Sequence, residues 1–152
     1  MRRLTAPIIA LLLLYTVPAS ADPASELLRR INSYRESLGL TALNLSAKLE
    51  AAALAHDADM ATQNYFAHRS PDGHSLKDRL EALGYAFHFA AENLAGGQRT
   101  PREVLESWKD SLGHNTNLLM PRVTEAGVAF SRNPQGRPIR WLWTLVLAEP
   151  LE

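Results

Sequence analysis

The sequence contains no cysteine among its 152 residues, which excludes disulfides, a thiolate nucleophile, thiolate metal ligands and a lipid attached to an N-terminal cysteine. It also has no excess charge of one sign, because 16 lysine and arginine residues balance 16 aspartate and glutamate residues without forming a basic cluster. Nucleic acid and anionic membrane surfaces are therefore poor candidates for partners. Beyond the N-terminal segment, no apolar run approaches the roughly 20 residues of a membrane-spanning helix.

The N-terminal segment has the pattern of a secretory signal peptide. Met1-Arg2-Arg3 gives a basic start, residues 8–17 form an apolar run rich in leucine, and Ala19-Ser20-Ala21 supplies the small residues that precede a cleavage site. We expect residues 1–21 to be removed near Ala21-Asp22, giving a secreted or periplasmic protein. The mature part, residues 22–152, has the length of a single domain and no membrane span.

Helix signals dominate the first part of the mature sequence. Asp22 before Pro23 predicts a helix start, and Gly39 predicts the end of this helix. Ser46 predicts the start of a second helix, rich in alanine, that runs to about Asn64.

Two more helices are expected before the C-terminal third. Ser75 begins a capping-box pattern for a short helix, and Thr100-Pro101 begins another capping box with proline at the first helical position. The second of these helices is expected to present Leu112 on its apolar side and to stop at Gly113. Between the two, residues 85–97 show no helical period.

The C-terminal third predicts a β-hairpin. Apolar residues alternate over 126–130, residues 133–136 supply a turn, and apolar residues alternate again over 139–147. The segment from Trp141 to Ala148 is apolar on nearly both faces, which is typical of a central strand covered on both sides. Helices first and an antiparallel hairpin last predict the α+β class, with helices packed on an antiparallel sheet.

Four polar residues, His68, Glu92, His114 and Glu125, stand in short distinctive phrases of the sequence. Each phrase is expected just after a helix or just before a strand, where loops bring functional side chains together on a rigid scaffold. The phrases read Tyr65-Phe66-Ala67-His68, Ala91-Glu92-Asn93-Leu94-Ala95, Gly113-His114-Asn115-Thr116-Asn117 and Thr124-Glu125-Ala126-Gly127-Val128.

These residues allow three kinds of chemistry. Two neutral imidazoles with a carboxylate can hold a divalent metal such as zinc, although no His-Glu-x-x-His pair places two of them on one helix face. A buried polar network is the second alternative, with Glu92 and Glu125 orienting the histidines. The third is a nucleophilic site, in which Ser111 and His114 act together with Glu92 or Glu125, although no Gly-x-Ser-x-Gly elbow is present.

The four phrases, in this order, resemble the bacterial branch of the CAP superfamily, also called the SCP domain family, which includes cysteine-rich secretory proteins, antigen 5 and plant pathogenesis-related proteins. The similarity covers residues 27–148. It implies a three-layer α-β-α sandwich around a central antiparallel sheet, with a polar cleft on one face. It also implies that His68, Glu92 and His114 face this cleft, and that His68 and His114 carry any divalent metal.

One position departs from the pattern of the eukaryotic branch. That branch has a glutamate three residues after the helix tryptophan, whereas here Trp108 is followed at this spacing by Ser111. Bacterial members resemble one another in having the strand glutamate, Glu125 here, as their acid. The sequence leaves open whether Glu125 completes the cleft.

We therefore expect a binding module rather than an enzyme, because no compact catalytic motif is present. Its partner is expected to be a small molecule, a component of the cell envelope or another protein. The alternative is a hydrolase, a peptidase or esterase, that uses metal-activated water or the Ser111-His114 pair. The expected ligand cleft consists of His68, Glu92, Asn93, Ser111, His114 and Glu125.

Two further groups of residues receive structural interpretations. His56 lies on the apolar stripe of the second helix and is expected to be a buried histidine with a hydrogen-bond partner rather than a ligand. The three tryptophans, Trp108, Trp141 and Trp143, are expected in the core.

Overall fold

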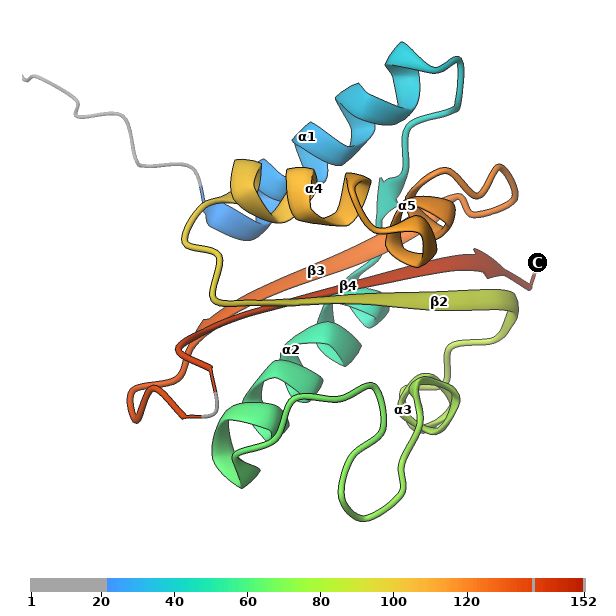
Figure 1. Cartoon of the computed structure of the whole chain (residues 1–152). Coiled ribbons are helices and arrows are strands. Elements are labelled where there is room, and N and C mark those ends of the chain that lie inside the picture. The colour runs from blue at the N-terminus through green and yellow to red at the C-terminus, as the bar shows by residue number, and fades with distance from the viewer. Residues whose placement is uncertain (1–21, 138, 152) are drawn as a thin grey trace, which may run out of the picture.

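The computed structural model describes residues 22–137 and 139–151 (Figure 1). The expected signal peptide, residues 1–21, lies outside the described residues. No helix of the described ranges is long and apolar enough to cross a membrane. The elements, in chain order, are α1 (Pro23–Ser37), β1 (Asn44–Leu45), α2 (Ala47–Gln63), α3 (Leu76–Ala82), β2 (Phe87–Gly96), α4 (Pro101–Lys109), α5 (Leu112–Leu118), β3 (Glu125–Arg132) and β4 (Trp141–Pro150).

The four strands form one sheet in the order β1-β3-β4-β2. β4 pairs antiparallel with β3 and with β2, and the two residues of β1 pair parallel with β3. The predicted hairpin and its buried central strand are therefore confirmed, and the short β1 makes the sheet mixed.

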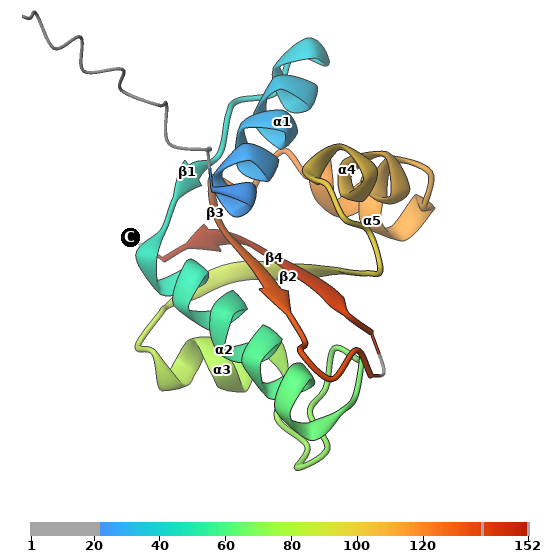
Figure 2. The ribbon, with the colours of Figure 1, turned by 90° about the vertical axis from the view of Figure 1, so that its left-hand side faces the viewer.

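Helices cover both faces of this sheet. Figures 1 and 2 show α1, α4 and α5 on one face and α2 and α3 on the other. The expected α-β-α sandwich of the α+β class is thus confirmed. α2 lies very close to β3, because a Cβ atom added at Gly127 would come within 2.1 Å of the backbone nitrogen of Glu50. Only glycine leaves room for this approach.

The core has one part on each side of the sheet. Trp108, Trp143 and Leu145 are buried between the sheet and the helices α1, α4 and α5, and Leu49 and Val146 are buried between the sheet and α2. Two of the three tryptophans are therefore in the core as predicted. Trp141 is only partly buried, and the guanidinium of Arg132 lies over its ring at 5.0 Å.

The predicted helix starts agree with the structure. The Asp22 carboxylate accepts a hydrogen bond from the Ser25 backbone at 3.0 Å, and Thr100 caps α4 by accepting one from Glu103. Ser75 and Asp78 form a complete capping box at the start of α3.

The prediction for the end of α4 was wrong. α4 ends at Lys109, and a separate short helix, α5, begins at Leu112 and includes Gly113 and His114. Leu112 is 86% exposed rather than on an apolar side. Ser111 at the N-cap position lets the chain start a new helix, so the glycine is not a stop signal here.

The segment without a helical period, residues 85–97, contains the ten-residue edge strand β2. Glu92 lies in the middle of this strand and His114 lies inside a helix, so the expectation that both lie in loops was wrong. Strand and helix positions fix a side chain more rigidly than loop positions do.

Candidate functional site

Strand β2 forms one edge of the sheet, and two of the expected site residues are neighbours on it. Glu92 is paired with Val146, which belongs to the core under α2, so the Glu92 side chain points to the α2 side. Asn93 points to the opposite side, where it meets α5. Because successive side chains of a strand alternate, the two faces of the sandwich both contribute side chains at this edge.

Glu92 is a buried carboxylate with a cation and a histidine bound to it. Its Oε2 lies 2.5 Å from Nη2 of Arg79 on α3, and its Oε1 lies 2.9 Å from Nδ1 of His68. Arg79 also donates a hydrogen bond to the backbone carbonyl of His68 at 3.2 Å. Charge-assisted pairs of this kind are strong and directional, so the three side chains hold one another in place.

The pairing with Glu92 sets the orientation of His68. A carboxylate oxygen accepts the hydrogen of Nδ1, which leaves Nε2 with a free lone pair whenever the ring is neutral. The side chain is 61% exposed, and within the described ranges no residue hydrogen-bonds to Nε2. His68 therefore presents Nε2 to solvent from a fixed position.

His56 on α2 contacts both Glu92 and the loop that carries His68. Its Nε2 lies 3.0 Å from the carbonyl of Ala67 and 3.8 Å from Oε1 of Glu92, and the residue is 1% exposed. Burial lowers the pKa of His56, and the negative charge of Glu92 opposes this only in part. The expectation of a buried histidine with a hydrogen-bond partner is confirmed. The contact between His56 and the carbonyl of Ala67 holds the loop that carries His68 against α2.

His114 approaches the same edge from α5. Asn93 donates a hydrogen bond to its backbone carbonyl at 3.1 Å and accepts one from Asn117 at 2.9 Å. The ring is half-buried, with its centroid 6.4 Å from that of Trp108. Burial lowers the pKa of His114, and the positive charge of His68 lowers it further. We call Arg79, His68, Glu92, Asn93 and His114 the β2 site.

Glu125 lies away from the β2 site. It begins β3, and β4 separates it from β2, so its backbone is about 10 Å from that strand by the usual spacing of about 4.8 Å between neighbours. Its Oε2 accepts a hydrogen bond from the hydroxyl of Tyr85 at 2.7 Å. The structure therefore brings His68, Glu92, Asn93 and His114 together but leaves Glu125 out.

Ser111 occupies the N-cap position of α5, and it is half-buried. No hydrogen bond joins its hydroxyl to His114 or to a carboxylate within the described part of the chain. The triad arrangement that a serine nucleophile requires is not formed by these residues.

The β2 site offers two imidazoles rather than a full set of metal ligands. The two oxygens of Glu92 are engaged by Arg79 and His68. Over residues 22–137 and 139–151, no group of three His, Cys, Asp or Glu side chains is placed to hold a metal ion together. A tightly bound zinc ion uses three or four protein ligands.

Arg79 is the site residue that the sequence reasoning missed. It lies 13 positions before Glu92 and on a different element, so no local spacing links the two. The only signal is indirect: a glutamate placed in the middle of a mostly buried strand needs a cation nearby.

The model of the CAP family, described as the cysteine-rich secretory protein family, matches residues 28–147. Two curated relatives come from Bacillus subtilis (strain 168): the uncharacterized protein YkwD, 39% identical over 99 residues, and the uncharacterized membrane protein YlbC, 36% identical over 107 residues. The matches cover 65% and 70% of this chain but 38% and 31% of those proteins. The chain thus spans about a third of the length of these relatives.

Two solved structures are similar to the whole domain. An extracellular protein containing an SCP domain from Bacillus anthracis matches with a TM-score of 0.73 and 26% identity, over 88% of this chain and 45% of that one. An outer surface protein from Borrelia burgdorferi matches with a TM-score of 0.76 and 18% identity, over 84% of this chain and 92% of that one. At this low identity, the second match is evidence for the fold alone.

Proposed function

The chain belongs to the cysteine-rich secretory protein (CAP) family, and we propose that it acts as an exported domain that binds a ligand or partner at the β2 site. The family membership confirms the prediction made from the four sequence phrases. The extracellular SCP-domain relative and the leader-like residues 1–21 support export.

One observation carries the binding proposal. Arg79 and Glu92 form a buried ion pair with an N–O distance of 2.5 Å, and Glu92 also binds Nδ1 of His68. The ring of His68 is therefore held in place while its Nε2 is open to solvent. His56 differs in this respect, because it is buried and its Nε2 is engaged by the carbonyl of Ala67 at 3.0 Å. A ring nitrogen that is held in a fixed position and is open to solvent is typical of a group that meets a ligand.

The chemistry of the β2 site favours a ligand with an oxygen acceptor or an anionic group. His68 can donate a hydrogen bond from Nε2 when it is protonated, and neutral His114 supplies a second polar group beside it. Small molecules, envelope components and proteins with exposed carboxylates or carbonyl groups all carry such acceptors.

Two imidazoles without a third ligand would hold a divalent metal such as zinc only weakly. His68 and His114 would supply the two protein ligands. Glu92 would not bind the metal itself but would orient the ring of His68 through Nδ1. A metal bound in this way supplies a Lewis acid that attracts an oxygen of the ligand.

The observations support binding over hydrolysis. Ser111 lacks a histidine partner within the described residues, and Glu92 is committed to Arg79 and His68 and is thus not free to orient His114. A hydrolytic mechanism would need a base next to a nucleophile, and the arrangement provides neither for Ser111.

Zinc titration by calorimetry on the purified protein tests the proposal. We expect weak, saturable binding that His68→Ala and His114→Ala each reduce at least about tenfold, whereas the matched variant His88→Ala, at an exposed position of β2, binds normally. Glu92→Gln is expected to weaken zinc less than either histidine variant does.

Two results would contradict the proposal. Zinc binding that neither histidine variant changes would remove the metal part. Turnover of a peptide or ester library that survives metal stripping and vanishes in Ser111→Ala would replace binding by serine hydrolysis as the function.

A further inference from the structure

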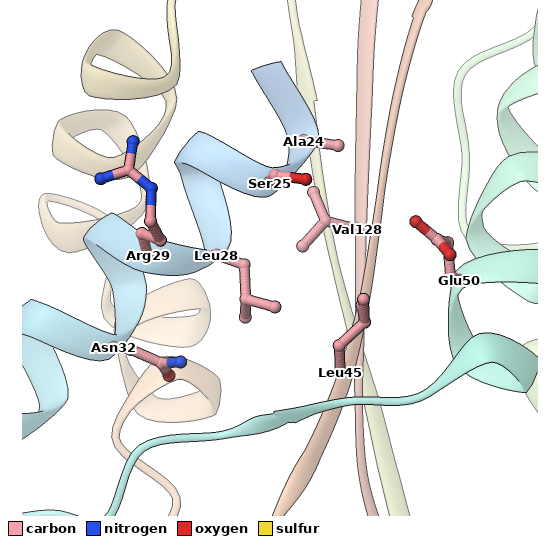
Figure 3. Close-up of a pocket in the computed structure, with 8 residues that line it drawn as sticks. All are labelled: Ala24, Ser25, Leu28, Arg29, Asn32, Leu45, Glu50 and Val128. Atoms are coloured by element: carbon pink, nitrogen blue, oxygen red, sulfur yellow. The ribbon is translucent and has the colours of Figure 1, made fainter. Parts of the chain in front are cut away.

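The opposite edge of the sheet contains an apolar slot that the CAP-type site does not use. A cavity of about 230 Å³ lies where β3 is no longer covered by β1 (Figure 3). Leu28 of α1 and Leu45 of β1 form one wall, Glu50 of α2 forms the other, and Val128 of β3 lies between them. We call this cavity the β3 slot.

The backbone of β3 is unpaired at this place. The amide of Asn44 donates to the carbonyl of Thr124 and that of Ser46 donates to the carbonyl of Ala126, both at 2.9 Å. Backbone groups alternate in direction along a strand, so the N–H and C=O of Val128 point to the same edge as those of Ala126. β1 ends at Leu45, and in the described part of the chain no backbone of another segment pairs with this edge at Val128. Val128 is only 3% exposed, so a partner reaches its backbone by moving the side chains that line the slot.

An unpaired donor and acceptor at strand spacing select a particular occupant. A hydrocarbon chain cannot satisfy either group, whereas an extended polypeptide satisfies both, in the way that strands add to sheet edges. The cavity of about 230 Å³ is smaller than the roughly 300–1,000 Å³ of a pocket for a drug-sized molecule, which suits the side chains of a short peptide segment.

The two walls give the side-chain preference. Leu45 is 58% exposed, and together with Leu28 it provides apolar surface on the α1 side. On the α2 side, Figure 3 shows the Glu50 carboxylate directed toward the slot, and no described residue forms an ion pair or hydrogen bond with it. Arg29 also lines the slot, but its guanidinium is turned away.

We propose that the β3 slot binds an extended polypeptide strand that pairs with the free edge at Val128. The strand places an apolar side chain against Leu28 and Leu45, and its neighbouring residue, on the other face, places a lysine or arginine against Glu50. This partner is independent of the ligand at the β2 site, because the two sites lie on opposite edges of the sheet.

A labelled synthetic peptide tests the proposal. We expect the purified protein to bind fluorescein-labelled Val-Lys-Val-Lys-Val with saturable anisotropy below about 1 mM, in the range of weak encounters. Glu50→Gln should weaken binding about fivefold, as for a partly exposed ion pair. Glu36→Gln, an exposed position of α1, is the matched control and should bind as the wild type does.

Chemical variants of the peptide separate strand pairing from simple charge attraction. Two peptides, N-methylated at the central valine or at the lysine that follows it, each lose one backbone donor, and one of these two donors faces β3. That peptide should bind at least about tenfold more weakly than the unmodified one, because the methyl group also blocks close approach. Amide NMR shifts on binding should be largest at Val128 and its neighbours on β3, which locates the peptide without any variant.

Four outcomes would overturn the proposal. Anisotropy that stays flat up to about 1 mM would remove the peptide site. Equal binding of both N-methylated peptides and the unmodified peptide would mean that the slot takes an amphipathic cation rather than a strand. Unchanged affinity in a folded Glu50→Gln variant would remove the charge preference. A concentration-dependent dimer that the peptide does not dissociate would assign the edge to a second copy of the chain.

Discussion

Two buried acidic side chains lie between α2 and the sheet, and their surroundings differ. Glu92 is 8% exposed and has Arg79 and His68 on its two oxygens. Asp57 is fully buried; its Oδ1 accepts a hydrogen bond from Thr144 at 2.6 Å, and its Oδ2 has no partner among the described residues. One carboxylate is neutralised by a cation, and the other has none.

The difference has a consequence for protonation. Burial raises the pKa of Asp57 to about 6, although the hydrogen bond from Thr144 opposes the shift and the charge of Glu92 adds to it. The acid without a cation thus takes up its proton at a higher pH than usual, whereas the acid that positions a histidine is paired with a cation. The comparison shows two ways in which this fold accommodates a buried acid: a cation beside Glu92 and a raised pKa at Asp57.

The largest expected effect comes from removing the cation of the paired acid. Arg79→Leu leaves the charge of Glu92 buried without its partner, which should lower the free energy of unfolding by about 3–5 kcal/mol in urea denaturation at pH 7. Arg102→Leu, an exposed position in the first turn of α4, is the control and should change stability little. Adding Glu92→Gln to Arg79→Leu should restore part of the lost stability, because it removes the unpaired charge. A decrease below about 1 kcal/mol for Arg79→Leu alone would contradict a strong ion pair between Arg79 and Glu92.

The second effect comes from removing the charge of the unpaired acid. The folded-state pKa of Asp57 is raised from its ordinary value of 3.8 to about 6. Below pH 3.8 the acid is protonated in both the folded and the unfolded state, so its ionisation does not lower the stability. As the pH rises from there through about 6, the free energy of unfolding falls. A shift of about two pKa units corresponds to about 3 kcal/mol. Asp57→Asn should therefore stabilise the protein by up to this amount at pH 8 and by little at pH 4.

Thermal unfolding at the two pH values measures this difference. Asp110→Asn, at the exposed C-cap of α4, is the matched control and should show no such pH-dependent gain. A gain of equal size at pH 4 and pH 8 would mean that packing, not ionisation, explains the effect.

The sequence predicts the parts of the fold that depend on local contacts. Helix starts at Asp22, Ser75 and Thr100 were recognisable because a cap acts within one turn. The hairpin was recognisable because its two strands alternate around a short turn. The four phrases predicted the family, and through it the sandwich.

The remaining features depend on contacts between distant elements. Arg35 of α1 is 1% exposed and donates from Nη1 to the carbonyl of Leu118 at 2.7 Å, whereas Leu38, at the end of the same helix, is 54% exposed. The periodicity of apolar residues along a helix cannot identify a buried cation.

The separation of Glu125 from Glu92 depends on the strand order, which places β4 between their strands. The pattern of residues within a single strand does not contain this order.

The smallest expected effect concerns the hydrogen bond that Asp57 does have. Thr144→Val keeps the shape of a fully buried side chain but removes the donor to Oδ1, so it should cost about 1–2 kcal/mol at pH 8. The cost should fall at pH 4, because a protonated acid gains less from the donor than a carboxylate does. Thr62→Val, an exposed threonine on α2 that bonds to a carbonyl of its own helix, is the control. Urea denaturation at both pH values measures the difference, and equal costs at pH 4 and pH 8 would show that Asp57 does not change its charge in this range.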